Sequence, residues 1–198
     1  MTDEMDNRDL AERVRLIENM MAEGRQRTAR WGWTFVLWGV AYYVATAWAS
    51  WGKSNLAWPV TMVAAALITA IAASRMLHGE PETAVGRAVG GVWRAMGISM
   101  SVVLFSLSFA GRYEGHVFVA IFGAMLGMTN LASARILQWK AQYACAGVWL
   151  ASTIVASFGS DRATAVAFFA AIFLCQIVFG IYAMTCESRR RQRGAVHV

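Results

Sequence analysis

The stretch ARWGWTFVLWGVAYY, residues 29–43, decides the class of this chain. Arg30 stands near its start, and no further charged residue follows before Lys53. A helix of about twenty apolar residues crosses the hydrocarbon core of a bilayer, which is about 30 Å thick. Similar runs recur along the chain, which is 58% hydrophobic and only 15% charged, whereas soluble domains are about 45–50% apolar and about 25% charged. The sequence therefore predicts an all-α, polytopic membrane protein.

Six such runs are separated by short polar segments. The segments GKSN, HGEPE, GRYEGH and GSDRA carry the turn-forming residues and charges that end apolar helices. The predicted transmembrane helices cover residues 31–51, 56–75, 92–111, 116–134, 139–158 and 164–184. We accordingly divide the chain into a cytoplasmic amphipathic helix at 1–30, a six-helix transmembrane bundle at 31–184 and a basic cytoplasmic tail at 185–198.

The distribution of positive charge predicts the orientation of these spans. Fifteen of the 18 arginines and lysines fall in the two termini and in the second and fourth loops, on one side of the predicted bundle. Cytoplasmic segments of membrane proteins carry the excess of positive charge, so both termini are expected in the cytoplasm. The preference for arginine over lysine is typical of a GC-rich bacterium, and the expected location is the bacterial cytoplasmic (inner) membrane.

Aromatic and polar side chains within the spans mark a candidate pocket. Trp31 and Trp33 lie beside Arg30 at the predicted inner surface, where such rings anchor helices. Trp38 and Tyr42 lie deeper and share one face of the first span. Polar groups buried in lipid need partners, and hydrogen bonding between helices is favoured here over contact with a ligand. The candidate pocket residues are Trp38, Tyr42, Asn130, Trp149 and Gln176.

Small residues recur at helical spacing in several spans. Such faces let helix backbones approach closely, which is how membrane helices gain packing energy. Packing within one bundle is the simpler interpretation in a chain rich in alanine and glycine, and contact with another subunit is the alternative. The candidate helix-packing or partner faces are Ala41, Ala45 and Ala49 in the first span, Gly97, Ser101 and Ser108 in the third, and Gly123 and Gly127 in the fourth.

The segment before the first span is predicted to form an amphipathic helix. Leu10, Val14, Ile17 and Met21 follow one another at spacings of four, three and four and therefore share a face. We interpret this helix as lying on the membrane surface or on the inner ends of the bundle, with a docking face for a partner or a second copy as the alternative. Two heptads are too few to define a coiled coil from the sequence. Gly24 is a candidate kink before the first span.

Sequence motifs indicate no chemistry. The chain contains no HExxH, GxSxG, P-loop or DxD motif, so we predict that it is not an enzyme. No cofactor is predicted; His116 as a haem or chlorin ligand is a weaker hypothesis than a solvated loop histidine. The cysteines form no CxxC pair and indicate no zinc site. The net charge of +6 follows from the topology, so nucleic acid is not an expected partner.

Two functions compete at this point. The first is a non-enzymatic membrane protein that acts through helix–helix contacts in the bilayer, with other membrane subunits or with itself, as an accessory or assembly subunit. The second is a small-molecule-binding membrane component, although the residues identify no specific ligand. The length, the six expected helices, the inward termini and the Ala41, Ala45 and Ala49 spacing resemble the S components of energy-coupling-factor vitamin transporters. That resemblance implies a contact between the first helix and a partner subunit. The short WGKSN loop departs from the large ligand-capping loop usual in that family.

Overall fold

A computed structural model gives the fold and describes residues 2–52, 56–76, 83–110 and 114–195. These residues form helices and no strand, which confirms the predicted all-α class. The helices are α1 (Thr2–Arg30), α2 (Gly32–Gly52), α3 (Ala57–Met76), α4 (Ala84–Phe109), α5 (Gly115–Leu137), α6 (Lys140–Phe158), α7 (Asp161–Ile172), the π-helix η1 (Phe173–Val178) and α8 (Phe179–Ala195).

Five helices in the described residues are long and apolar enough to cross a membrane. They are α3, α4, α5, α6 and the continuous run from α7 through η1 into α8, over Asp161–Arg189. Helix α2 is not one of the five, although it has 21 residues and no charged side chain. Its four tryptophans and two tyrosines score as weakly polar, which keeps its mean hydropathy below that of the five. The composition of the helices thus agrees with a membrane protein.

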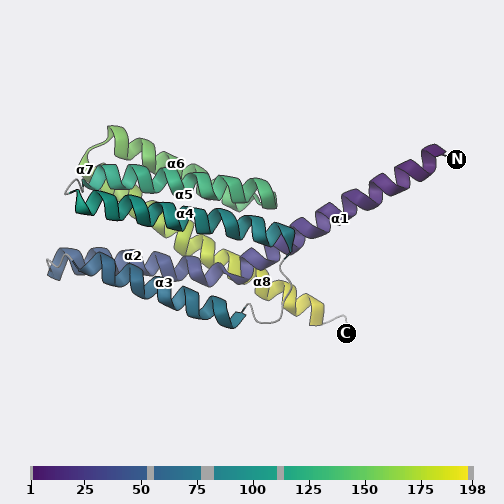
Figure 1. The fold of residues 1–198 in the computed structure, drawn as a ribbon, viewed down its shortest axis with the longest axis horizontal. Coiled ribbons are helices and arrows are strands. Elements are labelled where there is room, and N and C mark those ends of the chain that lie inside the picture. The colour runs from purple at the N-terminus through teal and green to yellow at the C-terminus, as the bar shows by residue number, and fades with distance from the viewer. Residues whose placement is uncertain (1, 53–55, 77–82, 111–113, 196–198) are drawn as a thin grey trace.

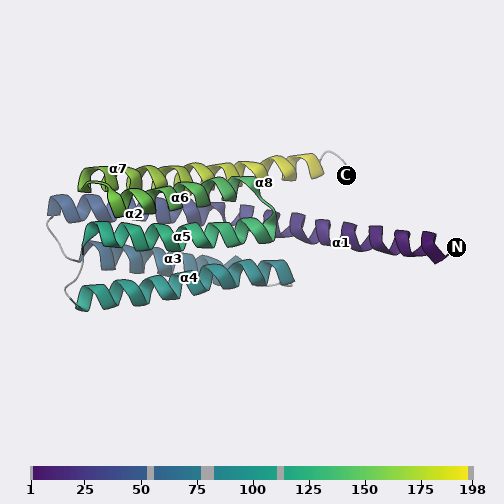
Figure 2. The ribbon, with the colours of Figure 1, turned by 90° about the horizontal axis from the view of Figure 1, so that it is seen from above.

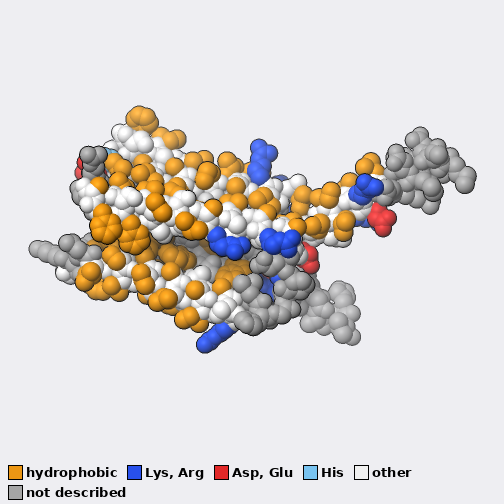
Figure 3. Space-filling view, in the orientation of Figure 1, with side chains coloured by type: hydrophobic (Ala, Val, Ile, Leu, Met, Phe, Trp, Pro, Cys, Tyr) orange, Lys and Arg blue, Asp and Glu red, His pale blue; other side chains and the backbone are white. Residues whose placement is uncertain are grey.

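The helices run side by side along the long axis of the molecule (Figures 1 and 2). Helix α3 packs chiefly on α2, whereas α4 packs on α5, and α5 packs most extensively on α6. The α7–η1–α8 run joins the two groups because it contacts both α2 and α6. Hydrophobic side chains cover the visible side of the bundle, and lysine and arginine side chains gather near the end where α1 leaves it (Figure 3).

Helix α1 extends beyond the bundle in both views (Figures 1 and 2). Only its C-terminal turns pack on the bundle, where Gly24 lies against Val85 of α4 and Leu137 of α5. The Arg25 guanidinium donates a hydrogen bond of 3.1 Å from Nη1 to the carbonyl of Leu137 at the end of α5. Helix α1 runs unbroken through Gly24 and ends only at Arg30. Gly24 provides close packing against α4 and α5, and a bend at this residue stays a prediction.

An aromatic cluster fills the bundle between these helices. The ring of Phe122 lies 5.2 Å from Tyr42, 5.7 Å from Trp149 and 5.5 Å from Phe168, measured between ring centroids. These four side chains come from α2, α5, α6 and α7, and Trp149 is completely buried. Edge-to-face pairs at such distances add to the energy of burial. The cluster therefore ties four helices that are distant in the sequence into one core.

Glycines permit the closest helix crossings. A Cβ atom on Gly180 of α8 would lie 2.7 Å from the carbonyl oxygen of Gly32 in α2, and a Cβ on Gly32 would lie 2.8 Å from the carbonyl oxygen of Gly180. On α5, Gly123 lies against Thr153 and Ser152 of α6, and Gly127 lies against Leu150 of α6. Any side chain at these positions would push the backbones apart.

Candidate functional site

A layer of buried polar side chains lies between the aromatic cluster and the end of the bundle from which α1 extends. Helices α5 and α6 are antiparallel, joined at residues 138–139, and Gly127 of α5 lies against Leu150 of α6. The residues between these contacts and the turn therefore lie at similar levels in the two helices. The Sγ atom of Cys175 donates to the carbonyl of Cys145 at 3.6 Å, which brings η1 to the same level. We call this set the polar layer; its members are Thr129, Asn130 and Ser133 of α5, Gln142 of α6 and Gln176 of η1.

Several polar atoms of this layer have no hydrogen-bond partner among the described residues. They are Ser133 Oγ, both amide atoms of Gln142 and Oε1 of Gln176. Thr129 and Asn130 instead bond to carbonyls one turn earlier in their own helix. An amide buried without a partner costs about 1–3 kcal/mol. The polar layer therefore holds unused hydrogen-bonding capacity in the interior of the bundle.

The π-helix η1 presents Gln176 to this layer. π-Helices are rare and are frequent at functional sites. Gly39 of α2 permits the contact, because a Cβ there would lie 2.9 Å from Cβ of Gln176 and 3.0 Å from Cγ1 of Ile177. The unpartnered Oε1 of Gln176 is thus held in the interior by the π-helix around it and by close packing against Gly39 of α2.

The five residues of the predicted pocket lie at two levels. Tyr42 and Trp149 belong to the aromatic cluster, and Trp38 packs beside Tyr42 with ring centroids 6.1 Å apart. Asn130 and Gln176 belong to the polar layer. Ser133 and Gln142, which are buried near the α5–α6 turn, were not predicted as members of the pocket. The signal was the presence of polar residues on the apolar faces of two adjoining helices.

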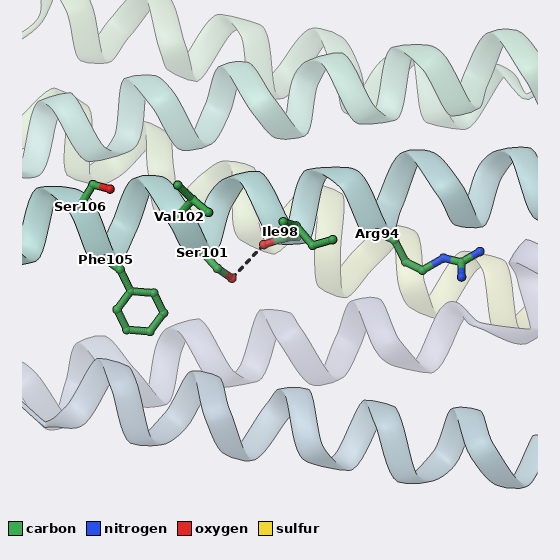
Figure 4. A pocket seen from close by; sticks show the side chains of 7 residues that line it. Arg94, Ile98, Ser101, Val102, Phe105 and Ser106 are labelled. Atoms are coloured by element: carbon green, nitrogen blue, oxygen red, sulfur yellow. Dashed lines mark hydrogen bonds between the residues drawn. The ribbon is translucent and has the colours of Figure 1, made fainter.

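The outward face of α4 is open. A surface cavity of about 660 Å³ is lined by Arg94, Gly97, Ile98, Ser101, Val102, Phe105 and Ser106, all of α4 (Figure 4). No atom lies within 4 Å of a Cβ built on Gly97, and the hydroxyl of Ser101 donates to the carbonyl of Gly97 at 2.8 Å. The chain's own described helices thus leave this face uncovered.

The other predicted packing faces differ from this one. Ala41 and Ala45 are buried and Ala49 is half-buried within the molecule. Gly123 and Gly127 contact α6. The side chain of Ser108 lies outside the described residues. Of the predicted faces, the structure therefore leaves only the Gly97–Ser101 face of α4 turned outward among the described residues.

The predicted docking face of α1 is also uncovered along most of its length. Leu10 is 61% exposed, Val14 48% and Ile17 51%, whereas Met21 is half-buried near the bundle. Leu16, which is outside the predicted face, is 61% exposed as well. An apolar stripe of this kind marks a contact site when it lies in water.

The potential metal ligands of the described residues do not cluster. They contain no group of three or more histidine, cysteine or acidic side chains that could hold a metal ion. His116 Nε2 lies 3.3 Å from a carboxylate oxygen of Glu114, and both side chains are well exposed, as for a solvated loop pair. The three cysteines are free thiols, and Cys145 and Cys175 are buried.

Comparison of the chain with protein-family models, with curated proteins and with solved structures gives no match.

Proposed function

We propose that the chain is a non-enzymatic integral membrane protein that acts through helix–helix contacts in the bilayer. In this proposal α2 is a sixth span, because it is uncharged over 21 residues and lies beside α3 and α8. Trp33, Trp48 and Trp51 near its two ends are suited to the headgroup regions. Both termini then lie on the arginine-rich side, which the positive-inside rule assigns to the cytoplasm.

The observation that carries the proposal is the open face of α4. In lipid, helices associate through close packing of small residues and through hydrogen bonds, not through a hydrophobic driving force. Gly97 and Ser101 provide a shallow strip with flanking apolar side chains at Ile98 and Phe105. No described part of the chain covers this strip. A transmembrane helix from another subunit, or from a second copy, would fill the cavity.

Bulky substitution at Gly97 tests this assignment. Gly97→Leu fills the strip without disturbing the isolated chain, because no atom lies within 4 Å of its Cβ. Gly147→Leu on α6 is the matched control, because Gly147 is also exposed and open. After extraction from native membranes, a partner or self-associated form is expected with the control and reduced with Gly97→Leu. Equal association of the two variants, or a monodisperse monomer without a partner, would contradict the proposal.

The polar layer favours a second candidate, a small-molecule-binding membrane component. The unpartnered amide of Gln142 and Oε1 of Gln176 provide donors and an acceptor for a polar ligand. Thermal unfolding in the presence of vitamins and metal ions tests this candidate. A stabilising compound should lose its effect on Gln142→Leu and keep it on Ile154→Leu at an exposed position of the same helix. No stabilisation by any of these compounds would remove this candidate.

A further inference from the structure

The apolar stripe of α1 continues a heptad pattern once the helix is known to begin at Thr2. Taking Val14 as position a places Leu10 and Ile17 at position d and Met21 at the next a. The same register places Asn7 at the preceding a. Val14 at a with Leu10 at d matches the pattern of two-stranded parallel coiled coils, whereas Ile17 at the other d position is neutral to this choice. The pattern thus covers just over two heptads, from residue 7 to residue 21.

The bundle itself cannot cover this stripe. Gly24, the next d position, packs against Val85 and Leu137, so the face meets the bundle only there. From that point α1 extends away from the helix ends (Figures 1 and 2). Helix α1 is inclined to the long direction of the bundle in Figure 1 and lies nearly along it in Figure 2, so in the proposed membrane orientation it leaves the bilayer instead of lying on its surface. The exposed Leu10, Val14 and Ile17 therefore face water.

The charges beside the stripe are complementary between two parallel copies. In the register above, Arg13 stands at position g and Glu18 at the following e, and both side chains are exposed. In a parallel dimer each g residue meets the next e residue of the partner helix, and such pairs set partner and orientation. Arg13 of each copy would therefore meet Glu18 of the other. The two-fold axis creates this pair twice.

We propose that α1 forms a parallel two-stranded coiled coil with α1 of a second copy of this chain. The proposal rests on the membrane orientation given under the proposed function, because two copies inserted the same way necessarily project their α1 helices in parallel. A coiled coil of just over two heptads is marginal for free peptides. Confinement in one membrane raises the effective concentration of the two helices and makes the short interface sufficient.

Disulfide trapping in the full chain tests the geometry. The experiment uses native membranes and a Cys186→Ser background, since Cys186 is the one half-buried cysteine and the other two are buried. Val14→Cys, at the centre of the stripe, should form a covalent dimer under mild oxidation. Glu12→Cys, on the outward position f of the same helix, is the matched control and should form about tenfold less. Equal trapping at both positions, or trapping of Val14→Cys only to another protein, would overturn the proposal.

Charge reversal tests whether the partner is a second copy. Arg13→Glu or Glu18→Arg alone should weaken trapping at Val14→Cys by about threefold or more, because two symmetry-related pairs become repulsive. The double variant Arg13→Glu with Glu18→Arg should restore it. A double variant as weak as the single ones would refute pairing between copies. Trapping at Val14→Cys should persist in the Gly97→Leu variant. Failure of the α4 contact and failure of the α1 contact can therefore be distinguished.

Discussion

Replacing Gly180 with alanine measures how much the fold depends on the backbone contact between α2 and α8. The added Cβ would lie 2.7 Å from the carbonyl oxygen of Gly32, 2.7 Å from Cγ2 of Val36 and 3.1 Å from the Val36 nitrogen, whereas ordinary contact begins at 3.4 Å. Two of these three atoms belong to the backbone, so no side-chain rotation relieves the clash. The helices must separate by several tenths of an ångström.

The expected cost follows from two opposing effects. Overpacking of a tight interface costs about 1–3 kcal/mol, and alanine regains about 0.5–1 kcal/mol over glycine inside a helix. Gly180→Ala should therefore lower the free energy of unfolding by about 1–2 kcal/mol. Gly147→Ala, where nothing lies within 4 Å of the new Cβ, should raise it by about 0.5–1 kcal/mol.

Reversible unfolding of both variants in detergent micelles, followed by tryptophan fluorescence, provides the comparison. The free energies of unfolding of the two variants should differ by about 2 kcal/mol. If Gly180→Ala proves as stable as Gly147→Ala, the two helices are not in backbone contact.

Three further substitutions examine other parts of the bundle. Arg25→Gln removes the charged cap on the Leu137 carbonyl and should cost about 1 kcal/mol, seen as faster amide hydrogen exchange in the last turns of α1. Gln142→Leu should raise the free energy of unfolding by about 1 kcal/mol, since its amide has no partner; a loss of stability would mean that a bound water or ligand satisfies that amide. Trp149→Ala should cost about 3–5 kcal/mol because the ring is completely buried, whereas Ile154→Ala, 61% exposed on the same helix, should cost far less.

The helices themselves were predictable because long uncharged runs end at polar turns. Five of the six predicted spans coincide with helices that are long and apolar enough to cross a membrane. The sixth prediction, at 31–51, coincides with α2, whose aromatic residues lower its mean hydropathy. Helix α4 begins at Ala84 instead of residue 92, because Val85 and Val89 extend its apolar face toward α1. Hydropathy alone does not mark such an amphipathic extension.

The use of each small-residue face could not be predicted, because spacing does not identify the neighbour. Gly97 and Gly123 have similar surroundings in the sequence, yet one is open and the other is covered by α6. Tyr42 and Trp149 were correctly singled out as deep aromatic residues, but their common contact with Phe122 depends on tertiary structure. Ser133 and Gln142 lie near helix ends, where polar residues ordinarily face water, and only the α5–α6 packing shows that they are buried.

The π-helix at Phe173–Val178 also sets the rotational phase of the last span. Each residue of an α-helix turns the chain by about 100°, so one residue more or less redirects everything beyond it. With η1 in place, Phe168 on one side faces Phe122, while Gly180 on the other side faces Gly32. Deletion of one residue within η1 would restore a regular helix and turn these two contacts out of phase. The π-helix thus allows α7 to pack on α5 and α8 to pack on α2 within one continuous span.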